Sequence, residues 1–217
     1  LITGGAGFIG INFVNYWSNK YKNHKLVILD KITYSSNEKY LNKFVRLNKK
    51  IVFIKGDICN TKLVNKIFEK YKINILVNFA AETHVDHSIK NPKKFIKSNI
   101  HGTFNLLECA RKYWNKNLIV KNHFHHISTD EIFGSLNIKG KPFSEKSPYD
   151  PSSPYSASKL ASDMIVNSYF KTYGMNTTIS NTSNNFGPFI DKSKLIPKII
   201  TNILLNKKIP IYGNNKQ

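Results

Sequence analysis

Short apolar runs alternate with amphipathic stretches along the whole chain. The strand-like runs cover residues 25–30, 51–57, 73–82, 122–129 and 176–183. Between them lie stretches such as TKLVNKIFEKY, whose apolar side chains recur at spacings of three and four, the pattern of a helix with one buried face. Buried strands that alternate with helices predict a parallel sheet with right-handed crossovers, and therefore a Rossmann-type doubly wound α/β domain.

The stretch at residues 91–113 has the clearest helical pattern. Asn91 and Pro92 are typical of an N-cap and a first helical position. A second long helix is expected after Ser152 or Ser153, either of which can cap it. The apolar residues of the first helix are expected on one face: Phe95, Ile96, Ile100, Phe104 and Leu107.

Composition changes this picture little. The chain has 217 residues, enough for one sizeable core, and a formal net charge of +20 at pH 7. Such a charge can indicate a nucleic-acid partner. The lysines, however, are spread along the chain among asparagines and isoleucines, and arginine occurs only at Arg46 and Arg111. We interpret the charge as a compositional bias and expect no nucleic-acid partner.

Several other classes of protein are not indicated. No run of about 18 apolar residues predicts a membrane span, and no basic region precedes the first glycines as in a signal peptide. Cys59 and Cys109 lack metal-ligand spacing, so we expect no metal and a reduced compartment, the cytoplasm. The chain begins inside an apolar run and stops just after a strand-like segment, so truncation at both ends is expected.

A glycine-rich loop, TGGAGFIG at residues 3–10, follows the first apolar residues. Its glycines permit a tight turn and the close approach of a pyrophosphate to a helix N-terminus. Asp30 follows about 20 residues later, where a carboxylate can hold the ribose 2′-OH of NAD and would repel the 2′-phosphate of NADP. Asp57 closes the third strand, where the adenine is expected. A purely structural glycine turn is the alternative, and the acid at this distance favours NAD.

A Tyr-xxx-Lys pair stands at the start of the second long helix. Tyr155 and Lys159 are four residues apart, so their side chains share one face of the helix. A lysine ammonium beside a phenol favours phenolate, which makes tyrosine a usable base near neutral pH. An ordinary surface pair is the alternative, and the upstream glycine loop argues against it.

Two adjacent acids, Asp130 and Glu131, directly follow the strand predicted over residues 122–129. Neighbouring acids often mark only a solvated turn. Because successive side chains of a strand point to opposite faces, two such acids can serve one substrate only where the chain has left the strand. That exit is expected here. The histidines before them are expected to pack in the core or against a helix: His123, His125 and His126.

These motifs together resemble the extended short-chain dehydrogenase/reductase family, which shares the glycine loop and the Tyr-xxx-Lys pair. The resemblance is sharper to the NAD-dependent nucleotide-sugar 4,6-dehydratases within it, through HHISTDEIFG, AAETHVDHSI, PSSPYSASK and SNNFGP. It covers essentially the whole chain. Related nucleotide-sugar epimerases and decarboxylases generally lack the adjacent Asp-Glu at this point. They remain alternatives, as does a non-catalytic NAD-binding fragment.

The resemblance implies a reaction. C4 of a nucleotide-linked glucose is oxidised, water is eliminated across C5 and C6, and the hydride returns to C6. It implies tightly bound NAD as cofactor, dTDP-glucose as the favoured substrate and deoxysugar biosynthesis as the pathway. Glu131 is the implied base at C5 and Asp130 the implied acid at the C6 hydroxyl. Thr129 and Tyr155 are implied to act at the C4 hydroxyl, with Lys159 beside the tyrosine.

The resemblance also implies binding residues. The implied NAD contacts are Gly4, Gly7, Phe8, Ile9, Gly10, Asp30, Lys31, Ile32, Thr33, Asp57, Ile58, Phe79, Ala80, Ala81, Glu82, Thr83, Ser98, Tyr155, Lys159 and Asn185. The implied sugar contacts are Thr83, Thr129 and Asn184, and the implied contacts to the nucleotide diphosphate are Lys194, Leu195, Pro210, Ile211 and Tyr212.

The chain departs from the family pattern at three positions. His87 stands where the family usually has arginine, Thr182 where it has cysteine, and Phe186 where it has tyrosine. The resemblance implies that residues 1–188 form the NAD-binding domain and that residues 189–217 begin a smaller nucleotide-sugar domain, which is incomplete.

A homodimer is implied as well. It is expected to form through the two long helices, at about residues 91–113 and 154–173. The expected apolar contacts are Phe104, Leu107, Met164 and Ile165.

Overall fold

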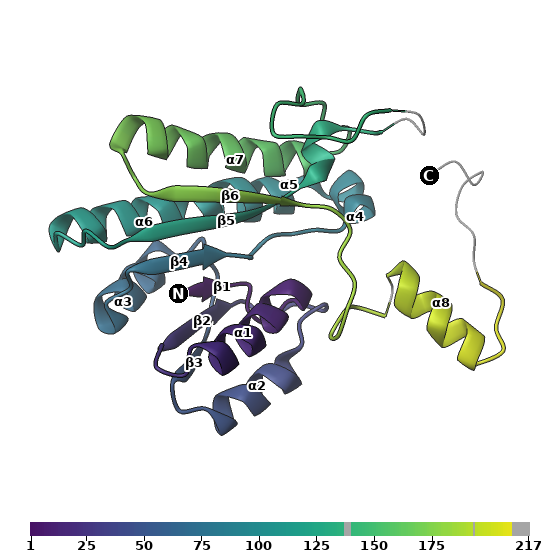
Figure 1. The fold of residues 1–217 in the computed structure, drawn as a ribbon, viewed down its shortest axis with the longest axis horizontal. Coiled ribbons are helices and arrows are strands. Elements are labelled where there is room, and N and C mark those ends of the chain that lie inside the picture. The colour runs from purple at the N-terminus through teal and green to yellow at the C-terminus, as the bar shows by residue number, and fades with distance from the viewer. Residues whose placement is uncertain (137–139, 193, 210–217) are drawn as a thin grey trace.

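The computed structural model describes residues 1–136, 140–192 and 194–209. Six parallel strands form one sheet in the order β3-β2-β1-β4-β5-β6 (Figure 1). This is the doubly wound parallel sheet that the alternating pattern predicts. The strands are β1 (Ile2–Thr3), β2 (Leu26–Asp30), β3 (Ile51–Lys55), β4 (Ile75–Asn78), β5 (His123–Thr129) and β6 (Thr177–Thr182).

Helices cover both faces of the sheet. The residues of β2 show this most clearly, since all five are buried. Val27 and Leu29 join the core on one face, while Leu26 and Ile28 join the core on the other. The first face is covered by α3 (Thr61–Tyr71), α6 (Gly102–Lys116) and α7 (Pro154–Tyr173), and the second by α1 (Phe8–Lys20) and α2 (Glu38–Leu47).

The helix predicted over residues 91–113 is not one regular helix. It consists of α5 (Pro92–Phe95), the π-helical segment η1 (Ile96–His101) and α6. A π segment adds a residue to each turn and so rotates the residues that follow. The predicted single apolar face is therefore wrong: Phe95 and Leu107 are buried, whereas Ile96 and Phe104 are exposed.

The buried face of this helical run carries polar residues as well as apolar ones. Ser98, Asn99, Thr103 and Asn105 are all buried. Asn99 Nδ2 donates to Ser158 Oγ on α7 at 2.8 Å, and Asn105 Nδ2 donates to the Ile58 carbonyl oxygen. These bonds satisfy groups that would otherwise be costly to bury.

Helix α7 is held at both ends. Ser153 caps it in a reciprocal capping box with Ser156, and Pro154 occupies the first turn, as expected for one of the two serines. Near its far end, Tyr169 Oη donates to Glu108 Oε1 of α6 at 2.7 Å. Arg111 bonds both Glu108 oxygens, and its hydrogen bonds lower the pKa of Glu108 to about 2. These contacts fix the helix that carries Tyr155.

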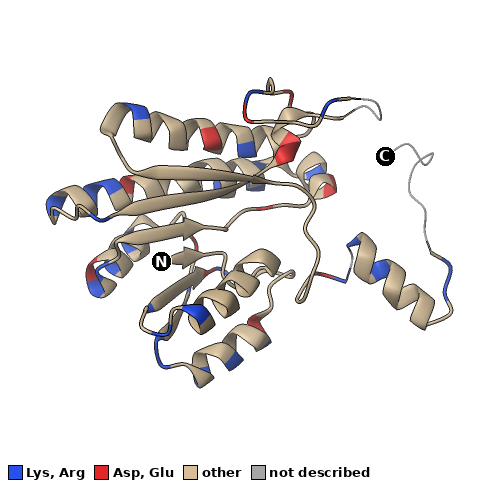
Figure 2. Ribbon diagram, in the orientation of Figure 1, with Lys and Arg blue, Asp and Glu red and all other residues tan. Residues whose placement is uncertain are grey.

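The last described helix, α8 (Leu195–Leu204), has no buried residue and lies apart from the sheet in Figure 1. Basic residues are spread over several helices rather than gathered on one (Figure 2). Within the described residues, no helix is long and apolar enough to cross a membrane.

Candidate active site

A cavity of about 590 Å³ lies at the carboxyl ends of the strands. Its walls come from the loop after β1, from the ends of β2 to β5 and from the segment after β6. The strand order reverses between β1 and β4, and doubly wound sheets bind ligands at that point. The cavity thus lies where the fold predicts a binding site.

The glycine loop forms the floor of this cavity. Gly4 has φ +66°, and a Cβ there would lie 2.6 Å from the Ala80 amide nitrogen at the end of β4. A Cβ on Gly10 would collide with the Gly4 carbonyl oxygen. Only glycine lets the loop pack this tightly, so that α1 begins at Phe8 with its amide end at the cavity.

Asp30 ties this loop to the end of β2. Its Oδ2 accepts from the Ala6 amide at 3.0 Å and its Oδ1 accepts from the Ile32 amide at 2.8 Å. The side chain is buried, which raises the pKa of Asp30, while the two amides oppose that shift. Each carboxylate oxygen retains a lone pair, and Asp30 lines the cavity.

Lys31, which lines the cavity, is held by an ion pair. Lys31 Nζ lies 2.7 Å from Glu82 Oε1 and also donates to Ser98 Oγ at 3.1 Å. Glu82 is held by Asn99, which bonds its backbone N–H and its carbonyl oxygen. A glycine floor, a helix N-terminus and an acid after β2 fit a dinucleotide with an unphosphorylated ribose.

Asp130 and Glu131 line the same cavity. Strand β5 ends at Thr129, and the chain enters the 3-10 turn η2 (Asp130–Phe133) at once. Thr129 Oγ1 accepts from the Glu131 amide at 3.2 Å, while Ile132 and Phe133 anchor the turn in the core. The exit from the strand is as predicted, and it explains why neighbouring acids share one cavity.

Asp130 affects the protonation of its neighbour Glu131. Partial burial and the charge of Asp130 raise the pKa of Glu131, and Lys194 opposes the shift. A carboxylate with a raised pKa binds a proton more readily, which suits a general base.

Tyr155 and Lys159 are buried beside these acids, and both line the cavity. The predicted lowering of the tyrosine pKa is wrong for this arrangement. Burial and the charge of Glu131 raise the pKa of Tyr155 to about 12, although its hydrogen bond with Thr129 opposes them. Lys159 Nζ instead donates to the Ile127 carbonyl oxygen at 2.7 Å, and burial lowers its pKa to about 8. Further positive charge in the cavity is needed to favour phenolate.

Most of the predicted site residues line this cavity. Two do not: Ile32 packs into the core under α1 and α2, and Glu82 contacts Lys31. Three more, Pro210, Ile211 and Tyr212, lie outside the described residues.

Sequence reasoning missed several lining residues. Some lie at a strand end or next to it, a position shared with many of the predicted residues, and that signal could have found them: Leu29, Gly56, Ile127, Ser128, Thr182 and Ser183. The others lie farther from a strand end, where no such signal exists: Ser35, Ser36, Ile190, Asp191 and Ile196.

The departures from the family pattern have different surroundings. The His87 ring stacks on His84 with centroids 4.6 Å apart, and its Nδ1 lies 3.2 Å from Tyr34 Oη, outside the cavity lining. Thr182 lines the cavity and donates to the Ser128 carbonyl oxygen. Phe186 is 74% exposed. Within the described residues, no group of three or more His, Cys, Asp or Glu could hold a metal.

Comparison with known proteins gives consistent matches. The protein-family model described as GDP-mannose 4,6 dehydratase matches residues 1–217. A curated dTDP-glucose 4,6-dehydratase from Haemophilus influenzae is 44% identical over 220 residues, which make up 100% of this chain and 64% of that protein.

Solved structures agree. The dTDP-glucose 4,6-dehydratase from Bacillus anthracis in complex with NAD has a TM-score of 0.87 at 40% identity, with 98% of this chain and 63% of that chain covered. The Streptomyces venezuelae dTDP-glucose 4,6-dehydratase with NAD and TYD bound has a TM-score of 0.88 at 36% identity, with 98% and 64% covered. The chain spans less than two thirds of the length of these relatives.

We expect Gly4→Ala to lower the free energy of unfolding by at least about 2 kcal/mol, since it adds a collision with Ala80 to an unfavourable φ. Gly174→Ala is the matched control, because Gly174 has φ +62° with nothing within 4 Å of its added Cβ. It should lose only about 1 kcal/mol. Urea unfolding of both variants gives the comparison, and equal losses would show that the loop tolerates a side chain at Gly4.

Proposed function

The chain belongs to the family described as GDP-mannose 4,6 dehydratase, and on that premise we propose that it is the NAD-binding and catalytic part of a dTDP-glucose 4,6-dehydratase, a hydro-lyase. The reaction converts dTDP-glucose to dTDP-4-keto-6-deoxyglucose for deoxysugar biosynthesis, as in rhamnose formation. One observation carries the proposal: Asp130 and Glu131 share a single cavity with Tyr155 and the glycine loop.

Residues 1–188 are proposed as the NAD-binding domain and residues 189–217 as the beginning of a nucleotide-sugar domain. The glycine loop and the α1 N-terminus would hold the pyrophosphate, Asp30 the adenosine ribose, and the lining after β3 the adenine. Thr83 and Asn184 would contact the sugar, while Lys194 and Leu195 would contact the diphosphate. All four line the cavity.

The bound NAD would supply the acceptor for the C4 hydride, the same hydride for C6, and a positive charge beside Tyr155. Tyr155 takes the proton of the C4 hydroxyl, and its raised pKa makes that added charge necessary. The Thr129 hydroxyl, already hydrogen-bonded to Tyr155, orients the C4 oxygen. Lys159 follows Tyr155 by one helical turn, with its Nζ bonded to the Ile127 carbonyl oxygen at the end of β5.

Elimination uses the two neighbouring acids. A ketone at C4 acidifies the C5 proton, which Glu131 removes. Asp130 protonates the C6 hydroxyl, which leaves as water. A base and an acid on one turn match these two transfers, because both must occur across a single carbon–carbon bond. Epimerisation and decarboxylation require no such pair, so Asp130 and Glu131 favour the dehydratase over those alternatives.

A cytoplasmic location completes the proposal. The thiols of Cys59 and Cys109 are unpaired, which suits a reducing compartment. A non-catalytic NAD-binding fragment is the second candidate, since the chain spans less than two thirds of its relatives. Measuring NAD affinity and turnover separately distinguishes the two.

We expect NAD to bind at least about tenfold more tightly than NADP, since a phosphate beside the Asp30 carboxylate places like charges together. Calorimetric titration of the chain with each dinucleotide measures the ratio. Asp30→Asn should reduce the ratio of NAD affinity to NADP affinity. Asp57→Asn changes another acid of the cavity and should leave that ratio unchanged. Equal affinities in the unmodified protein would contradict the assignment of Asp30.

Glu131→Gln in the full-length protein should slow elimination by about 10²–10⁴-fold while oxidation at C4 continues. The amide keeps the shape of the side chain and removes its basicity, and the groups at C4 are untouched. Exchange of the C5 hydrogen with deuterated solvent is the direct measurement.

Asp130→Asn serves as the comparison. It should have a milder effect on product release, because water or a neighbouring donor can partly protonate a leaving hydroxyl. If Glu131→Gln exchanges the C5 hydrogen as fast as the unmodified enzyme, Glu131 is not the base.

A homodimer through α6 and α7 is proposed with revised contacts. Leu107 is fully buried in the core and cannot contribute, and Ile165 packs partly against the same core. Phe104 and Met164 are 44% and 39% exposed. Phe104→Glu should therefore produce monomers in light scattering at micromolar concentration. Tyr16→Glu, at an exposed aromatic on α1, should remain dimeric, and a monomeric unmodified protein would refute the interface.

A further inference from the structure

Lys159 is an ionisable side chain that is almost completely buried. Its side chain is 3% exposed. Two groups lie within hydrogen-bond distance of its Nζ: the Ile127 carbonyl oxygen at 2.7 Å and His126 Nε2 at 3.3 Å. Neither is an anion. Burying an ammonium group is costly unless a negative charge compensates it. These two uncharged contacts therefore do not stabilise the charged form of Lys159 by themselves.

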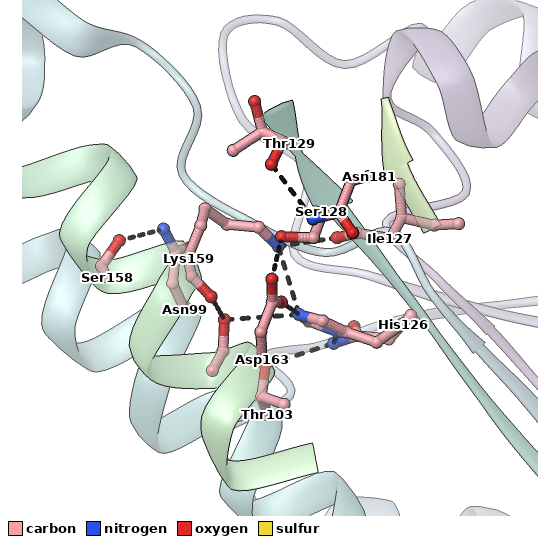
Figure 3. Close-up of polar contacts among 12 residues, drawn as sticks. Asn99, Thr103, His126, Ile127, Ser128, Thr129, Ser158, Lys159, Asp163 and Asn181 are labelled. Carbon is pink, nitrogen blue, oxygen red and sulfur yellow. Dashed lines mark hydrogen bonds and ion pairs between the residues drawn. The ribbon is translucent and has the colours of Figure 1, made fainter. Parts of the chain in front are cut away.

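Asp163 supplies a negative charge from the same helix. It follows Lys159 by four residues, so both lie on one face of α7 together with Tyr155. Figure 3 shows Lys159 and Asp163 turned toward the end of β5, with the His126 ring beside both. Asp163 is 2% exposed and does not line the 590 Å³ cavity. It touches neither the proposed cofactor site nor the proposed substrate site.

The Asp163 carboxylate is only partly satisfied by hydrogen bonds. Its Oδ2 accepts from Ser128 Oγ at 2.6 Å. Its Oδ1 is buried and makes no hydrogen bond within the described part of the chain, although it lies 3.4 Å from His126 Nε2. An anion held with so few donors depends on a nearby cation.

His126 does not supply that cation. It is 1% exposed, and burial together with the Lys159 charge holds its pKa well below the ordinary value. The ring is therefore neutral, with Nδ1 3.1 Å from Asn78 Nδ2 and Nε2 facing Ser162, Lys159 and Asp163.

We propose that Asp163 is a positioning residue whose carboxylate balances the charge of Lys159 inside the protein, with Nε2 of the neutral His126 ring near both. The inference rests on the proposed function only for the catalytic role of Lys159. Other titratable groups near this pair are Tyr155 on α7 and Glu131 on η2, and both lie on the cavity side. The charge of Asp163 also acts on Tyr155, where it raises the pKa.

The shifts agree with this geometry. Burial lowers the pKa of Lys159 to about 8, and the charge of Asp163 is what opposes it. Burial raises the pKa of Asp163 to about 6, and Ser128, Lys159 and the Asn181 side chain oppose that rise. Without Asp163, the lysine would lose its proton within the neutral pH range.

The first test is a titration of Lys159 by NMR in protein labelled with ¹³C at lysine Cε, with the signal assigned by Lys159→Met. Asp163→Asn keeps the shape and removes the charge, so the Lys159 pKa should fall by at least about one unit. Ser128→Ala is the matched control, since it removes a neutral hydrogen bond to Asp163 and keeps the charge. The Lys159 pKa should shift less in Ser128→Ala than in Asp163→Asn. An unchanged Lys159 titration in Asp163→Asn overturns the proposal.

The second test does not depend on whether Asp163→Asn folds. Coupling between two sites is reciprocal, so Lys159→Met should raise the pKa of Asp163, followed by the ¹³Cγ signal, by the amount that Asp163 raises that of Lys159. An unchanged Asp163 titration also overturns the proposal. Neither measurement uses turnover: a coupled pair in an inactive protein would count against the proposed function alone, and an uncoupled pair in an active enzyme against this inference alone.

Discussion

Parallel pairing sends the carboxyl ends of all six strands to one edge of the sheet, and the cavity depends on that constraint. The glycine loop, Asp30, Asp57 and the Asp130–Glu131 pair lie far apart in sequence, yet each lies at the end of a strand or just after it. Their meeting in one cavity needs no long-range contact beyond the sheet itself. Burial of β2 on both faces then makes the sheet rigid, because each alternate residue belongs to a different core.

Much of the fold and of the site could be predicted from the sequence, for identifiable reasons. Apolar positions recur at clearly different intervals in strands and in helices, so the order of the elements could be predicted. The strand ends then indicated many of the residues that line the cavity. The π-helical segment η1 could not be predicted, since its buried Asn99 depends on hydrogen-bond partners from elsewhere in the chain, Glu82 and Ser158. Tertiary hydrogen bonding overrode the local apolar pattern.

Electrostatics was the other property beyond reach of the sequence. The four-residue spacing predicted that Tyr155 and Lys159 share one face of a helix, but it does not predict how deeply that face is buried. Burial dominates the pKa shift of both groups and gives the tyrosine the opposite sign from the one expected. The same burial makes the charge of Asp163 important for Lys159. In the sequence Asp163 is a single acid within a helix, and nothing there predicts this effect.

Helix α7 presents Tyr155, Lys159 and Asp163 at intervals of four, between a serine cap and a glycine end. One residue inserted between positions 155 and 163 would turn the far part of that series by about 100° around the helix axis. Evolutionary length changes in this protein should therefore be absent from these two turns.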